Sequence, residues 1–90
     1  MTVTLRQLKE CGACKDGLDR FRMLFGTKAA RVTRRRLAMF GADLDWFVLK
    51  LLPWYWHEYC DAYFAIAARR PAWPESSLNV AALADVLGLK

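Results

Sequence analysis

The sequence predicts an all-α fold, built as a compact bundle of five or six short helices. Apolar residues recur at spacings of three and four along most of its 90 residues, which is typical of helices that bury one face. The sequence lacks segments that alternate polar and β-branched residues, as half-buried strands do. The few glycines and prolines fall mostly between the helical segments, where they end one helix or begin the next.

Capping residues set the first two predicted helices. Thr4, with Gln7 three residues later, is typical of a capping box and predicts a helix over residues 4–10. A second helix over residues 14–25 carries an apolar stripe at helical spacing. Gly26 is well placed to end this second helix.

Two further helices are predicted in the middle of the chain. Residues 27–32 read as a basic connector, after which Thr33 caps a helix that ends at residue 40. Asp43 caps the next helix, over residues 44–52, which is strongly apolar.

The last third of the chain predicts two helices and one loop. Pro53 is suited to the first turn of a helix, so the fifth helix is placed over residues 54–70. Residues 71–77 contain two prolines and two serines and predict a loop. A final helix is expected over residues 79–87, with Gly88 after it.

Length and composition predict one domain over residues 1–90. A chain this short buries a modest share of its surface, so its core must be dense, and 56% of its residues are hydrophobic. No stretch approaches the roughly 20 apolar residues of a membrane helix, and no secretory signal is visible. We therefore expect no membrane partner, a cytoplasmic location and three reduced cysteines.

Positive charge is concentrated in the first part of the chain. Residues 1–36 contain ten Lys or Arg and three Asp or Glu, whereas residues 37–90 contain four and six. The densest basic set is Lys28, Arg31, Arg34, Arg35 and Arg36. Helical spacing would place Lys28, Arg31 and Arg35 on one side. We expect the set to bind an anionic partner, either nucleic-acid phosphates or an acidic protein patch. A solvated face that keeps the protein soluble is the competing interpretation.

The predicted fifth helix is apolar nearly all round. Its candidate interface residues are Trp54, Tyr55, Trp56, Tyr59 and Tyr63. The three tyrosines repeat every four residues on one side, and a neighbouring strip holds Trp56, Cys60 and Phe64. Most of these rings must fill the core of so small a protein. We nevertheless expect one strip to face the core and the other to face a partner or a second copy, because Trp and Tyr are common interface hot spots.

The cysteines and the single histidine raise the question of a metal. Cys11 and Cys14 form a C-x-x-C pair, and His57 and Cys60 a second pair, so that together they have the residue types of a tetrahedral zinc site. Cysteine is also commonly buried as a small apolar residue, and such spacings arise by chance. We therefore expect no cofactor, with zinc as the alternative.

Other chemistry finds little support in the sequence. The only histidine lies among Trp and Tyr residues, and no phosphate-binding glycine loop or dense carboxylate cluster appears, so we expect no enzymatic activity. Residues 31–52 have the outline of a helix-turn-helix, but the second helix is too apolar to read base edges. Residues 83–89 resemble the opening half of such a motif without a helix after it.

A series of short motifs runs in order through the first half of the chain: Leu5-Arg6-Gln7-Leu8, Ala13-Cys14, Gly17 with Phe21, Phe25-Gly26, Val32-Thr33, Asp45-Trp46 and Leu51-Leu52. This series resembles the pattern of a family of small phage- and prophage-associated helical domains of unknown function. The resemblance covers residues 4–52 and implies a helical domain of phage or prophage origin. The arginine run and the aromatic segment within residues 53–90 depart from the family pattern.

These observations favour a non-enzymatic protein-binding module. With the phage resemblance, the expected partner is a host protein or a protein–nucleic-acid complex, such as an antiviral defence complex that the chain inhibits, as an anti-CRISPR protein would. The alternative is a nucleic-acid-associated protein that contacts phosphates nonspecifically through the arginine set. Homodimerisation through the aromatic helix is a further option.

Overall fold

The prediction of an all-α protein is confirmed. The computed structural model describes residues 1–40 and 44–89, and six α-helices and one small sheet lie within them. The chain divides into two compact units, residues 1–32 (unit 1) and residues 33–90 (unit 2), and each is described by itself. The boundary falls inside the segment 4–52 that carries the family resemblance.

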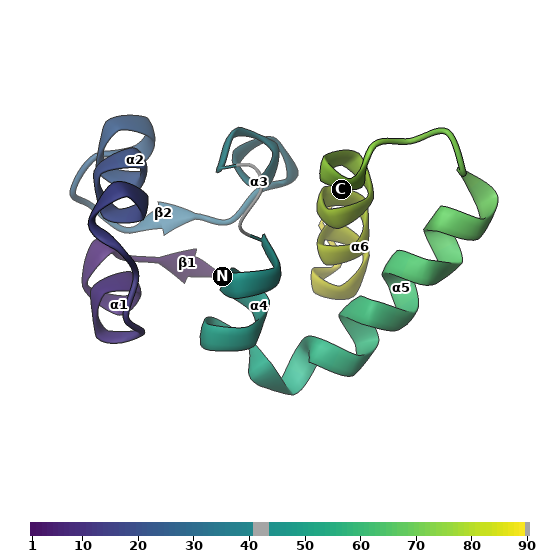
Figure 1. Cartoon of the computed structure of the whole chain (residues 1–90). Coiled ribbons are helices and arrows are strands. Elements are labelled where there is room, and N and C mark those ends of the chain that lie inside the picture. Colours follow the sequence, from purple (N-terminus) through teal and green to yellow (C-terminus); the bar gives the residue numbers. More distant parts are fainter. Residues whose placement is uncertain (41–43, 90) are drawn as a thin grey trace. The chain divides into compact units, whose positions relative to one another are not determined.

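Unit 1 consists of two helices and a two-stranded sheet (Figure 1). Its elements are β1 (Thr2–Val3), α1 (Leu5–Glu10), α2 (Lys15–Phe25) and β2 (Ala30–Arg31). The strands are antiparallel, with Thr2 opposite Arg31 and Val3 opposite Ala30. The prediction that residues 27–32 are only a connector was therefore wrong. Two residues are too few to show strand alternation in a sequence, and only the pairing of distant segments creates this sheet.

The helix ends of unit 1 follow the predicted capping chemistry. The Gln7 backbone N–H donates to Thr4 Oγ1 at 3.1 Å, and the Thr4 backbone N–H donates to Gln7 Oε1 at 2.9 Å, which completes the capping box. Gly26 follows α2 with φ of 78°, a conformation that glycine adopts without a steric cost. The apolar stripe predicted for α2 consists of Leu18, Phe21, Leu24 and Phe25. Phe21 is buried and the other three are half-buried.

Unit 2 contains four α-helices and one 3₁₀ turn. Its elements are α3 (Arg34–Phe40), α4 (Leu44–Leu51), η1 (Pro53–Tyr55), α5 (Trp56–Arg69) and α6 (Glu75–Leu87). Pro53 opens the 3₁₀ turn, as its fixed φ favours. The predicted loop 71–77 was too long, because Pro74 serves as the N-cap and α6 starts at Glu75. The predicted cap Asp43 lies outside the described residues.

Helix α6 is the centre of unit 2. It contacts α3, α4 and α5, and Figure 1 shows it between α3 and α5. Its buried residues include three alanines, Ala81, Ala82 and Ala84. Small side chains let neighbouring helices approach closely, so α6 can be surrounded on several sides while Leu78 and Leu83 fill the remaining space.

One polar cluster, with two buried members and one exposed member, joins three of these helices. Tyr59 of α5 is 2% exposed, and its Oη lies 2.7 Å from Asp45 Oδ1 of α4 and 2.9 Å from the Asn79 side-chain amide of α6. A phenol has one hydrogen, so Tyr59 donates to one of the two groups. The carboxylate can only accept, so Tyr59 donates to Asp45. The Asn79 atom placed 2.9 Å from the phenol is Oδ1, and the amide is satisfied when it is turned so that its NH₂ donates to Tyr59.

The surroundings of Tyr59 keep its hydroxyl protonated. Burial raises the pKa of Tyr59 far above the ordinary value near 10, and the hydrogen bond to the Asp45 carboxylate raises it further. Tyr59 is therefore a neutral donor at physiological pH and is unsuited to serve as a general base.

Within residues 1–40 and 44–89, no helix combines the length and hydropathy that crossing a bilayer requires.

Removal of the Tyr59 hydroxyl should destabilise unit 2. Tyr59→Phe keeps the ring and leaves the buried Asn79 amide without its partner, which costs about 1–3 kcal/mol of unfolding free energy. Tyr63→Phe is the matched control, since Tyr63 lies one turn later on α5, is half-buried and makes no hydrogen bond to any described residue. Urea denaturation of both variants checks this. Equal losses for the two would contradict the assignment.

The same cluster predicts a loss of stability in alkali. The pKa of Tyr59 is raised in the folded state, so its contribution is complete below the unfolded value near pH 10 and declines as the pH rises above it. Urea denaturation at pH 8 to about 11 should show a steeper decline for the wild type than for Tyr59→Phe. Parallel declines of the two proteins would show that Tyr59 does not ionise on unfolding.

Candidate functional site

The aromatic residues of η1 and α5 divide into an inner and an outer group. Tyr59 belongs to the core, which corrects its prediction as an interface residue. The reason is that its ring is buried and its hydroxyl bonds to the buried Asn79 of α6 and to Asp45, an exposed residue of α4. Tyr55 and Tyr63 flank it at helical spacing and are half-buried. The tyrosine strip therefore lies against the core.

Exposed rings lie on η1 and on the side of α5 away from Tyr59. Trp54 is 68% exposed and Phe64 is 69% exposed. His57, Asp61 and Ala68 are also exposed and recur at helical spacing with Phe64. We call the following residues the α5 outer face: Trp54 of η1, and His57, Asp61, Phe64 and Ala68 of α5.

Neighbouring rings hold the exposed ones in place. The Trp54 and Tyr55 ring centroids are 6.2 Å apart, and the Phe64 and Tyr63 rings meet edge to face at 5.5 Å. Trp56 is half-buried, with its ring 5.8 Å from that of Tyr59. Each exposed ring thus contacts a half-buried one.

The predicted basic set does not lie on one helix. Lys28 precedes β2 and Arg31 lies within it, so both belong to unit 1, whereas Arg34, Arg35 and Arg36 open α3 in unit 2. The expected alignment of Lys28, Arg31 and Arg35 was wrong because residues 27–32 are not helical. The Arg36 backbone N–H donates to Thr33 Oγ1 at 3.2 Å, which caps α3 as predicted.

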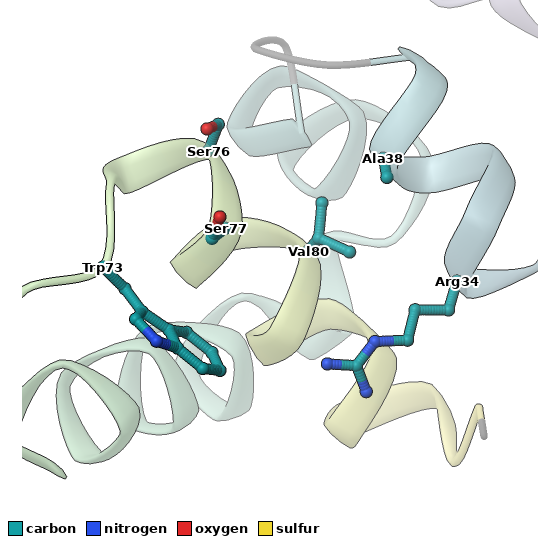
Figure 2. Close-up of a pocket in the computed structure, with 6 residues that line it drawn as sticks. All are labelled: Arg34, Ala38, Trp73, Ser76, Ser77 and Val80. Atoms are coloured by element: carbon teal, nitrogen blue, oxygen red, sulfur yellow. The ribbon is translucent and has the colours of Figure 1, made fainter. Parts of the chain in front are cut away.

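Arg34 instead takes part in a groove that the sequence did not reveal. A hollow of about 360 Å³ in unit 2 is lined by Arg34 and Ala38 of α3, by Trp73, and by Ser76, Ser77 and Val80 of α6. Figure 2 shows the Arg34 and Trp73 side chains entering from opposite sides, with Val80 between them. This hollow therefore has a cationic wall, an aromatic wall and a partly apolar floor.

A second hollow adjoins the first. It measures about 320 Å³ and shares Arg34 and Trp73 with it, and Arg69, Arg70 and Asp85 add charged groups. We call the two together the Arg34–Trp73 groove. Three guanidinium groups and one carboxylate of the described residues line it, and together these side chains carry a positive charge.

A short turn places Trp73 in this groove. The Trp73 backbone N–H donates to the Arg70 carbonyl at 3.1 Å, closing a turn with Pro71 at its second position, where the fixed φ of proline is favourable. The Arg70 guanidinium carbon lies 5.5 Å from the centroid of the Trp73 ring, within cation–π range.

The groove residues Arg69, Arg70 and Trp73 were missing from the predicted sites. Arg69 and Arg70 were predicted only as the last residues of the fifth helix, over residues 54–70. The available signal was the run Arg-Arg-Pro-Ala-Trp-Pro, in which two prolines fix an aromatic residue beside two cations.

The cysteine and histidine candidates are distributed over both units. Cys11 and Cys14 lie in unit 1, and His57 and Cys60 lie on α5 in unit 2. No three His, Cys, Asp or Glu side chains among the described residues are grouped to hold a metal ion. Cys14 instead caps α2, where its Sγ accepts a hydrogen bond from the Gly17 backbone N–H at 3.4 Å.

Cys60 is a poor nucleophile in this setting. Desolvation raises the pKa of its thiol, and the nearby Asp45 and Asp61 carboxylates raise it further. Because the thiolate is the reactive form, the shift lowers reactivity at neutral pH.

No protein-family model, curated protein or solved structure matches the chain.

Proposed function

We propose that this protein is a non-enzymatic binding module that docks on a protein partner through the α5 outer face. The observation that carries the proposal is the exposure of Trp54 and Phe64, at 68% and 69%. Covering a large aromatic side chain that faces water lowers the free energy. Trp and Tyr are also enriched among interface hot spots.

The energetic gain from covering these rings is substantial. Burying the exposed two-thirds of each ring is worth about 1–2 kcal/mol before the costs of association. The Trp54 and Phe64 rings already contact the half-buried Tyr55 and Tyr63. His57 and Asp61 lie on the same face and supply polar groups around the rings, as the rim of a protein interface does.

The chemistry of α5 also favours binding over catalysis. His57 is exposed and makes no hydrogen bond to any described residue, so nothing orients it as a base. Cys60 is kept as a thiol, and Tyr59 serves the core. A binding role uses the exposed rings, whereas a catalytic role leaves them unexplained.

The sequence resemblance suggests which partner to test first. A phage-encoded protein of this kind would act in the host cytoplasm on a host protein or a protein–nucleic-acid complex of antiviral defence. In that setting, the α5 outer face meets the protein surface, and the net charge of +5 speeds encounter with an acidic partner.

Substitution of the two rings tests the proposal. The double variant Trp54→Ser, Phe64→Ser should weaken partner binding about 10- to 100-fold in Kd, as loss of interface hot spots does. Its stability should hardly change, because both rings are largely exposed. The measurement is quantitative capture of host proteins on the immobilised chain, followed by calorimetry with the captured protein.

Met23→Ser is the matched control, since Met23 is 79% exposed on α2 in unit 1. A partner retained equally by wild type, control and double variant would contradict docking through α5. Sedimentation of the purified chain separates the homodimer alternative: a wild-type dimer that the double variant dissociates assigns the face to a second copy.

A further inference from the structure

We propose that the Arg34–Trp73 groove binds a single-stranded nucleic acid, with backbone phosphates at Arg34 and Arg69 and a base against Trp73. The proposal does not depend on the α5 outer face, because it uses different residues. It replaces the predicted basic set with a site that α3, the end of α5 and α6 assemble within unit 2.

Positive charge is concentrated in the Arg34–Trp73 groove. Residues 33–90 contain seven Lys or Arg and six Asp or Glu, so unit 2 is close to neutral as a whole. Among the described residues, the groove nevertheless gathers three arginines and one carboxylate, that of Asp85. Arg34 and Arg69 make no ion pair with any described residue. Their guanidinium groups are therefore available to a phosphate, which they bind with two parallel hydrogen bonds.

Neighbouring residues hold Trp73 in position in the groove. The Pro71 turn and the Arg70 guanidinium fix the indole, and the ring remains 40% exposed. Figure 2 shows the indole and Arg34 directed toward the same space over α6. A flat ring beside cations is the combination that single-strand binding proteins use, because every base has a face to stack and every linkage carries a charge.

The same features favour a nucleic acid over an acidic peptide. A carboxylate side chain matches the guanidinium groups but makes no use of a flat indole. A nucleotide supplies a phosphate and a flat base within one repeat, as the arrangement of Arg34, Trp73 and Arg69 requires. The site has no evident means of reading base edges, so the expected binding is independent of base sequence.

Charge variants provide the first test. Fluorescence anisotropy with a labelled oligothymidylate at low salt measures Kd for the full chain and its variants. Arg34→Gln and Arg69→Gln should each weaken binding about 3- to 10-fold and lower the slope of log K against log salt by about 0.7. Arg35→Gln is the matched control, because Arg35 is exposed on the same helix and lines neither hollow. It should change Kd less than twofold, in line with the small effect of a peripheral charge.

Ring variants provide the second test. Trp73→Ala should weaken oligothymidylate binding about 5- to 100-fold, and Trp73→Phe should restore much of it. An abasic strand of the same length keeps the phosphates and lacks the bases. Its binding should respond to Arg34→Gln but not to Trp73→Ala. Circular dichroism of each variant confirms that the helices are retained.

Three outcomes would overturn the proposal. One is equal weakening by Arg34→Gln and Arg35→Gln, which would mean that net charge alone attracts the strand. Another is equal loss of the abasic and thymidylate strands on Trp73→Ala. The third is polyglutamate binding as tightly as oligothymidylate and with the same dependence on Trp73, which would assign the groove to an acidic protein segment.

Discussion

The hydroxyl of Tyr59 is the constraint on which unit 2 depends. It joins Asp45, an exposed residue of α4, and the buried Asn79 of α6 to α5 through two hydrogen bonds. Apolar contacts tolerate sliding and rotation, but a buried amide and phenol are satisfied in one arrangement only. The cluster therefore fixes the registers of three helices against each other.

The orientation of α5 follows from that constraint. With Tyr59 inside, residues half a helical turn away must face outward, and these include Phe64. A helix that is apolar nearly all round cannot bury every side in a protein of this size. The exposure of Phe64 is thus a direct consequence of the polar anchor on the inner side. This connects the most buried hydroxyl of the fold with the surface that we assign to a partner.

The central position of α6 has a second consequence. Because α3 and α5 both contact α6, Arg34 at the start of α3 lines the same hollow as Arg69 at the end of α5. Neither residue marks a site alone. The alanines of α6 permit this close arrangement, and the Pro71 turn places Trp73 at the junction of the two hollows. A nucleic-acid site on the groove and a protein site on the α5 outer face are compatible with a partner that contains both components.

The sequence by itself determined the helices and most of their ends, because caps and stop signals such as Thr4, Gln7 and Gly26 act over a few residues. It also identified α5 as the element with surplus aromatic surface. Only the tertiary structure decided which rings are buried, since Tyr59 differs from Tyr63 by its distant partners and not by its helical position. The pairing of β1 with β2 and the Arg34–Trp73 groove both depend on contacts between segments far apart in the chain. No local pattern encodes such contacts, because the interactions that select them form only when the helices pack.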